Sequence, residues 1–159
     1  MISSTNFSIL VNGTPSQPFK VSRGLRQGDP LSPLLFILVV KGLGRYIKKE
    51  VRERNLKGIQ IWGSNLPITH QQFVDDIMLF CKVSLREARR IKAILDLFMK
   101  ASGTQINNDK SCTYFFNTYG NIINFLTGTL GFRSGELPTR YLGTPLDLNP
   151  LRMSNWQET

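Results

Sequence analysis

A helical repeat of apolar residues between positions 33 and 54 is the feature that most constrains the fold of this 159-residue chain. Apolar side chains recur every three or four residues, so a helix formed here would have one apolar face that must pack against another element. The members of this face are Leu35, Phe36, Val39, Leu43, Tyr46, Ile47 and Val51. Ser32 and Pro33 are typical of an N-cap and a first helical residue. The pattern predicts a helix from Pro33 to Arg54.

A second helix is marked by a capping box that begins at Ser84. In this motif the Ser84 hydroxyl and the Glu87 carboxylate each accept a hydrogen bond from a backbone amide that the helix leaves unpaired. Gly103 follows the last periodic residue and supplies the positive φ that ends many helices. The predicted buried face of this helix comprises Ala88, Ile91, Leu95, Phe98 and Met99.

The remaining segments have the features of short strands and turns. Asn12-Gly13 predicts a tight hairpin turn within "NFSILVNGTPSQPFKV". The stretch from Gly58 to Val83 predicts short strands separated by turns, and "SCTYFF" at 111–116 predicts another strand. A short helix over 121–130 and a hairpin around Tyr141 complete the pattern. Strands and helices in this mixed order predict a single domain of the α+β class.

Charge and composition narrow the classes of partner. The net charge of +9 favours a polyanion, either a nucleic acid or an anionic membrane. The longest apolar run, 34–40, is too short to cross a bilayer, and the first ten residues lack the basic and apolar regions of a secretory signal. Cys81 and Cys112 are too few for a disulfide framework, so we expect buried thiols in a reducing, intracellular compartment.

Basic residues gather in two groups, one on and just after each predicted helix. The first group is Lys41, Arg45, Lys48, Lys49, Arg52, Arg54 and Lys57, and the second is Lys82, Arg86, Arg89, Arg90 and Lys92. They form either a surface that contacts phosphates or solvated helix faces with pairs such as Glu53 and Lys57 four residues apart. The sequence leaves both interpretations open.

Two carboxylates, Asp75 and Asp76, stand between the apolar runs of "FVDDIMLF". Asp is common in tight turns, so an ordinary solvated hairpin turn accounts for the pair. From these two residues alone the turn is the simpler interpretation, and the alternative is a site for a divalent cation, because Mg²⁺ prefers hard oxygen ligands and usually takes one or two carboxylates.

A second polar motif, "SRGLRQGDPLSPLLF", precedes the first predicted helix. Gly24 and Gly28 allow the backbone to approach a ligand closely. The side chains that can bind phosphate or form hydrogen bonds are Arg23, Arg26 and Gln27. The alternative is an irregular loop in which Asp29 and Ser32 cap the helix.

Four segments in this order resemble the reverse transcriptases of LINE-type (non-LTR) retrotransposons, most closely those of plants. They are "RGLRQGDPLSPLLF", "FVDDIMLFC", "SGTQINNDKSCTYF" and "YLGTPL", and they span nearly the whole chain. The resemblance implies a partial right-hand polymerase palm, an antiparallel sheet packed on helices, truncated at the fingers and thumb. Residues 1–136 would be partial fingers and palm, and 137–159 the primer-grip segment and the start of the thumb.

The resemblance also implies roles for individual residues. Asp75 and Asp76 match the catalytic pair that binds two Mg²⁺ ions in the intact enzyme, and Lys110 matches a lysine that acts as a general acid near the triphosphate. The nucleotide-binding positions are Arg26, Gln27, Gly28, Phe73 and Val74. The primer-grip positions are Tyr141, Leu142 and Gly143.

One departure concerns a third catalytic carboxylate, which the family carries on a strand upstream of "RQGDPLSP". Asp29 is the first acidic residue of this chain, so that carboxylate is missing. We therefore expect weak Mg²⁺ binding, an unpaired sheet edge and no polymerase activity from the isolated chain.

The implied partners are an RNA template, a DNA primer and a deoxynucleoside triphosphate for the intact enzyme, and nonspecific nucleic acid for this chain, with no membrane. A nuclear location would follow if the element is functional. Two alternatives remain, an inactive relic that binds nucleic acid nonspecifically at most, and an organellar intron maturase-like protein.

Overall fold

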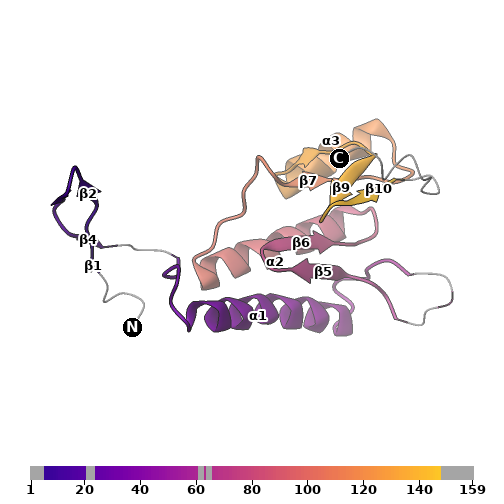
Figure 1. Cartoon of the computed structure of the whole chain (residues 1–159). Coiled ribbons are helices and arrows are strands. Elements are labelled where there is room, and N and C mark those ends of the chain that lie inside the picture. Colours follow the sequence, from indigo (N-terminus) through magenta and orange to yellow (C-terminus); the bar gives the residue numbers. More distant parts are fainter. Residues whose placement is uncertain (1–5, 21–23, 61–62, 64–65, 148–159) are drawn as a thin grey trace. The chain divides into compact units, whose positions relative to one another are not determined.

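The computed structural model describes residues 6–20, 24–60, 63 and 66–147. The chain divides into two compact units (Figure 1). The first comprises Met1–Lys82 and Arg90–Gln105, and the second comprises Val83–Arg89 and Ile106–Thr159. The predicted mixture of helices and short strands is confirmed. Arg23 and residues 148–159, which carry part of the predictions above, lie outside the described residues.

Helix α1 (Ser32–Arg52) agrees with the first predicted helix to within two residues. All seven residues of the predicted apolar face are buried or half-buried, and Leu43 and Ile47 are the most buried of them. Ser32 as the N-cap is wrong, because Leu31 occupies that position. Its backbone amide already donates to the carboxylate of Asp29 at 2.8 Å, so the loop satisfies the helix start one residue earlier.

Helix α2 (Leu85–Ser102) begins after Ser84, as the capping box predicts. The Ser84 hydroxyl accepts a hydrogen bond from the backbone amide of Glu87 at 3.2 Å. Three predicted core residues are buried and two are half-buried; Ile94 was missed and is only 2% exposed. Gly103 has a φ of 73°, so the predicted glycine stop is confirmed.

Strands β5 (His70–Phe73) and β6 (Asp76–Leu79) form an antiparallel hairpin that lies against α1 in the first unit. Gly44 makes this close approach possible. A methyl group on Gly44 would lie only 3.1 Å from Oε1 of Gln72 and 3.2 Å from Nε2 of His70. The side-chain amide of Gln72 also donates to the backbone carbonyl of Val40 at 3.5 Å. One face of the hairpin is therefore fixed on the helix that follows the "RQGDPLSP" loop.

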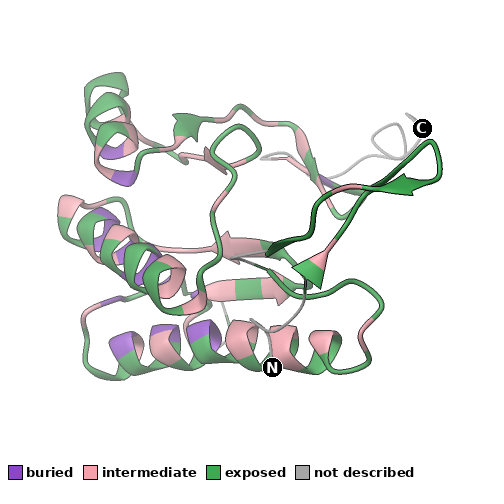
Figure 2. Cartoon of the chain, turned by 90° about the vertical axis from the view of Figure 1, so that its left-hand side faces the viewer, coloured by how far each residue is buried: buried purple, intermediate pink, exposed green. Residues whose placement is uncertain are grey.

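A buried ion pair joins α1 to α2 in the first unit. Glu50, on the buried face of α1, is 1% exposed and accepts a hydrogen bond from the guanidinium of Arg90 on α2. The apolar side chains around the two helices form most of the core, which Figure 2 shows in purple. Its most buried members in this unit are Leu43, Ile47, Leu56 and Ile94.

Four two-residue strands near the N-terminus form two small antiparallel pairs. They are β1 (Asn6–Phe7) with β4 (Phe19–Lys20), and β2 (Leu10–Val11) with β3 (Thr14–Pro15). Asn12 and Gly13 connect the inner pair with φ values of 50° and 81°, which confirms the predicted turn.

The second unit contains one helix and four short strands. They are β7 (Cys112–Thr113) parallel to β8 (Arg133–Ser134), α3 (Gly120–Leu130), and the antiparallel pair β9 (Thr139–Tyr141) and β10 (Thr144–Leu146). The predicted helix over 121–130 and the hairpin at Tyr141 are confirmed. The strand predicted over 111–116 is only two residues long, because it pairs only with the two residues of β8.

Every sheet of the described residues has two strands, so the larger antiparallel sheet of a polymerase palm stays a prediction. The proposed boundary at residue 136 also stays a prediction. Cys81 and Cys112 form no disulfide bond, and both are half-buried, less than expected. None of the helices in the described part of the chain is long and apolar enough to cross a membrane.

Candidate active site

Asp75 and Asp76 lie at the tip of the β5–β6 hairpin. Phe73 pairs with Asp76, so Val74 and Asp75 form the two-residue connection and Asp76 begins β6. The strand-turn-strand arrangement predicted for "QQFVDDIMLF" is therefore confirmed. Both aspartates are exposed, which leaves their carboxylates accessible to a cation or a ligand from solvent.

The backbone at Val74 is strained. Its φ of 50° is in the left-handed region, which a β-branched residue rarely adopts. A positive φ at the first position of a two-residue connection is typical of a type II′ turn, where glycine is usual. Such a conformation costs on the order of 1–3 kcal/mol and often occurs at functional sites. It fixes the chain direction immediately before Asp75.

The exposure of the two aspartates keeps the repulsion between their carboxylates small. In water, two carboxylates about 5 Å apart repel each other by less than ~1 kcal/mol. Within the described segments, neither side chain forms an ion pair, and no group of three acidic, histidine or cysteine side chains comes together. The pair therefore fits a divalent cation as two hard oxygen ligands, without a third protein ligand from the described residues.

The "RQGDPLSP" loop folds on itself before α1. The amide of Asp29 donates to the carbonyl of Arg26 at 3.4 Å, and Gly28 provides the positive φ of 83° that this turn needs. The Ser32 hydroxyl also donates a hydrogen bond to the carbonyl of Arg26, at 2.7 Å. These contacts confirm part of the capping interpretation, since Asp29 binds the Leu31 amide. They also leave the side chains of Arg26 and Gln27 exposed.

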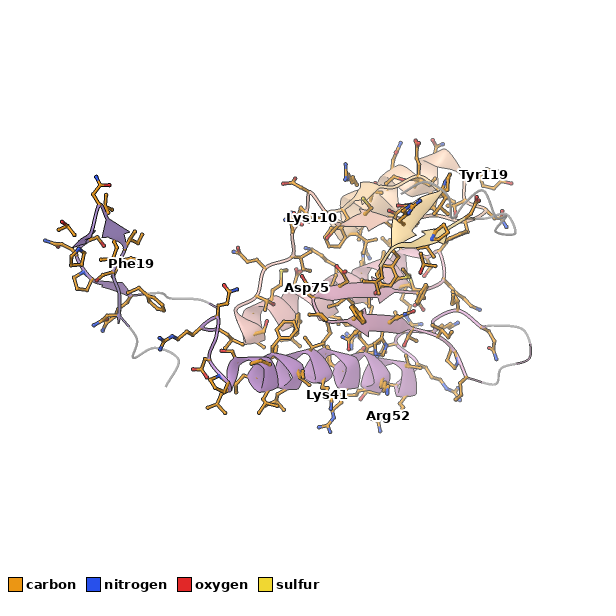
Figure 3. The ribbon with its side chains drawn as sticks, viewed as in Figure 1. Phe19, Lys41, Arg52, Asp75, Lys110 and Tyr119 are labelled. Carbon is orange, nitrogen blue, oxygen red and sulfur yellow. The ribbon has the colours of Figure 1, made fainter. Side chains whose placement is uncertain are left out.

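The first unit thus contains both of the motifs that carry the resemblance. The loop leads directly into α1, and the hairpin packs on α1 through Gly44. Figure 3 shows Asp75 on the side of α1 opposite to Lys41. The nucleotide-binding roles of the loop residues, and of Phe73 and Val74, stay predictions.

The other predicted site residues belong to the second unit. Lys110 is exposed in a loop whose Asn107 side chain accepts hydrogen bonds from the amides of Asp109 and Lys110, at 3.0 and 3.2 Å. Leu142 and Gly143 connect β9 to β10 with φ values of 52° and 77°, as in a type I′ turn. The general-acid role of Lys110 and the primer-grip role of Tyr141 to Gly143 stay predictions.

His70 is at the other end of the hairpin from the aspartates and is half-buried. The Thr69 hydroxyl lies 2.9 Å from its Nδ1. Burial, and to a smaller extent the positive charge of Lys48, hold the pKa of His70 below its ordinary value. These contacts are those of a packing residue at the base of the hairpin.

The first unit thus combines the "RQGDPLSP" loop with an exposed aspartate pair at the tip of a tight hairpin, the two features on which the resemblance depends most. Residues 1–146 match the family described as "Reverse transcriptase (RNA-dependent DNA polymerase)", and the chain belongs to this family.

Two relatives are similar to parts of the chain. An uncharacterized mitochondrial protein of Arabidopsis thaliana is 36% identical over 110 residues, which are 69% of this chain and 88% of that protein. The retrovirus-related Pol polyprotein from the type-2 retrotransposable element R2DM of Drosophila melanogaster is 33% identical over 102 residues. That match covers 64% of this chain but only 9% of the polyprotein.

Proposed function

We propose that this chain contributes the catalytic aspartate pair of an RNA-directed DNA polymerase from a non-LTR retrotransposon of the plant LINE type. The observation that carries the proposal is the exposure of Asp75 and Asp76 at the tip of a hairpin, in a chain of the reverse transcriptase family. Similarity to a retrotransposable element's Pol polyprotein supports the element class, and the Arabidopsis relative supports a plant origin.

The proposal assigns a task to each group of residues. Asp75 and Asp76 would serve as ligands for Mg²⁺, which would supply activation of the primer 3′-hydroxyl and stabilisation of the leaving pyrophosphate. The exposed Arg26 binds phosphate oxygens of the incoming nucleotide, and Gln27 forms hydrogen bonds with it beside Gly28. Phe73 and Val74 contact the nucleotide from the hairpin. Lys110 donates a proton to the pyrophosphate, and Tyr141, Leu142 and Gly143 hold the primer strand.

A third carboxylate has to join the pair in the active enzyme. Two ligands do not fix the geometry of a two-metal site, and the described residues bring no third ligand to the hairpin. On this proposal the polypeptide of 159 residues, taken alone, extends no primer. The proposal further assigns an RNA template, a DNA primer and deoxynucleoside triphosphates as the partners of the assembled polymerase.

Manganese binding tests the hairpin directly, because Mn²⁺ broadens the NMR signals of nearby nuclei and takes the same oxygen ligands as Mg²⁺. In the ¹⁵N-labelled chain, we expect submillimolar Mn²⁺ to broaden the amides of residues 73–77 first. The double variant Asp75→Asn/Asp76→Asn should lose this effect, whereas Asp96→Asn, at an exposed carboxylate of α2, should retain it. The proposal is contradicted if the amide signals of residues 73–77 are not broadened first, or if their broadening is unchanged in the double variant.

An inactive relic of such an enzyme is the second candidate. It is favoured by the same observation of a pair without a third ligand, together with the net charge of +9. A relic would bind nucleic acid through charge alone and would show no selective Mn²⁺ effect at residues 73–77. A maturase-like protein would instead prefer a structured intron RNA to a primer–template duplex.

A further inference from the structure

The outward face of α1 carries a single stripe of positive charge. Its members are Lys41, Arg45, Lys48, Lys49 and Arg52, and all five are exposed. Their spacing of four, three, one and three residues places them within an arc of about 100° around a helix of 3.6 residues per turn. The stripe therefore faces solvent along the C-terminal half of α1.

Most of this charge is not neutralised. Lys49 pairs with Glu53 at 3.7 Å, but the other four cations form no ion pair within the described part of the chain. The basic group of α2 differs in this respect. There, Arg90 pairs with Glu50, and Lys92 pairs with Asp96 at 3.0 Å.

The stripe lies away from the aspartate end of the hairpin, although Lys48 is near enough to His70, at the other end of the hairpin, to lower the pKa of that imidazole. The hairpin contacts α1 at Gly44 and at the carbonyl of Val40. Figure 3 shows Lys41 and Arg52 projecting from the side of α1 away from Asp75. An α-helix with its side chains is about 10–12 Å thick, so a strand held at the aspartates does not reach the stripe directly.

The dimensions of the stripe fit one strand of a nucleic acid duplex. Eleven residues separate Lys41 from Arg52, a rise of about 16 Å at 1.5 Å per residue. Phosphates of one duplex strand recur about every 3.4 Å along the axis, so the stripe spans about five of them. No Trp, Tyr or Phe lies in the stripe, whereas helices that lie on membranes usually combine basic residues with such side chains. The exposed apolar residues Leu34, Ile37 and Leu38 lie on the same face in the N-terminal half of α1, before the first cation of the stripe.

We propose that Lys41, Arg45, Lys48 and Arg52 form a second nucleic-acid surface that binds the phosphate backbone of a duplex, independently of the aspartate hairpin. The surface reads no base sequence, since it offers only cations at phosphate spacing. It would hold a part of the duplex that is not at the catalytic hairpin. That part belongs either to the nucleic acid bound at the hairpin or to a second nucleic acid molecule.

Fluorescence anisotropy with a labelled 20-base-pair RNA–DNA duplex tests this surface in the 159-residue chain. Four phosphate contacts predict a slope of about −3.6 in log K against log salt, a loss of about 150-fold between 50 and 200 mM. The triple variant Lys41→Gln/Arg45→Gln/Arg52→Gln should bind with a slope of about −0.9. The control Lys82→Gln/Arg89→Gln/Lys100→Gln removes the same charge elsewhere and should keep the wild-type slope. Circular dichroism of each variant confirms that it is folded.

The hairpin variant separates this surface from the catalytic proposal. Asp75→Asn/Asp76→Asn should bind the duplex with the wild-type slope, whether or not the aspartates bind metal. The inference is overturned if the two triple variants lose the same affinity, because overall charge then explains binding. It is also overturned if the hairpin variant alone changes the slope, or if the wild-type chain binds phosphatidylserine vesicles and no duplex.

Discussion

Replacement of Arg90 by Met should strongly destabilise the first unit. The perturbation removes the cation from Glu50, a carboxylate that is only 1% exposed between α1 and α2, while it keeps a side chain of similar length. Methionine fills the space of the alkyl stem, so the change isolates the charge from the packing.

The magnitude follows from the asymmetric burial of the pair. A buried charge that loses its partner costs about 3–5 kcal/mol. We expect the lower end, about 3 kcal/mol at pH 7, because Asn55 and Tyr46 also help to hold the pKa of this carboxyl below its ordinary value. Glu50→Gln should cost less, about 1–2 kcal/mol, since the Arg90 side chain that it leaves behind is 36% exposed and remains solvated. A double variant with Met at both positions should be more stable than Arg90→Met alone.

The pH dependence distinguishes charge from packing. The hydrogen bond from Arg90 is the largest cause that holds the pKa of Glu50 below its ordinary value of 4.5. A lowered native pKa contributes stability that is present above pH 4.5 and is lost as the pH falls through the native pKa. In Arg90→Met, burial without the cation should raise the pKa of Glu50, so this variant gains stability as its carboxyl takes up a proton. The two stability curves should therefore approach each other as the pH falls below 4.5.

Urea denaturation followed by circular dichroism at 222 nm measures both effects. With a slope of about 2 kcal/mol/M, the predicted loss lowers the midpoint of Arg90→Met by about 1.5 M at pH 7. The reasoning is refuted if the variant lies within about 0.5 kcal/mol of the wild type at pH 7. A difference at pH 3.5 as large as that at pH 7 also refutes it, because a packing defect does not depend on the protonation of Glu50.

Two further substitutions, each with a control variant, test the hairpin and its support in the same urea assay. Gly44→Ala should destabilise the chain by about 1–3 kcal/mol, because its methyl group meets Gln72 and His70 at 3.1 and 3.2 Å. In its control Gly42→Ala the added methyl group has no atom within 4 Å, so this variant should stabilise α1 by about 0.5–1 kcal/mol. Equal effects of the two variants would contradict the close approach of α1 and β5. Val74→Gly should stabilise the chain by up to about 1 kcal/mol, because the backbone strain that it relieves is larger than the extra conformational entropy that glycine adds to the unfolded chain. Its control Val83→Gly should give no such stabilisation. A loss of stability in Val74→Gly would show that Val74 is not strained.

The helices could be predicted from the sequence because their signals are local. The apolar periodicity of α1 and the Ser84 cap of α2 depend on residues within a few positions of one another. Even Glu50 could be assigned to the buried face, since it follows Leu43 by seven residues and Ile47 by three. The partner of Glu50 could not be predicted, because Arg90 is forty residues away and the chain contains many other cations.

The hairpin was predicted in outline, but its conformation was not. Apolar runs on both sides of Asp75 and Asp76 indicate two strands and a turn. The positive φ of Val74 has no sequence signal, since valine disfavours that region and only its surroundings hold it there. The N-cap at Leu31 was missed for a related reason, because the side chain of Asp29 competes for the helix start. The relation of Lys110 and Tyr141 to the aspartates depends on long-range packing, which no local pattern encodes.

A graft into an active polymerase tests the central claim most directly. In a polymerase of the type-2 retrotransposable element, the 102 matching residues would be replaced by those of this chain, so that the host supplies the remaining active-site ligands. The account predicts Mg²⁺-dependent extension of a DNA primer on an RNA template by this chimera. Asp75→Asn should abolish that extension, whereas Asp96→Asn should leave it unchanged. A folded chimera that extends no primer while its parent does, or that extends it equally well with Asp75→Asn, contradicts the assignment of the hairpin as the catalytic element.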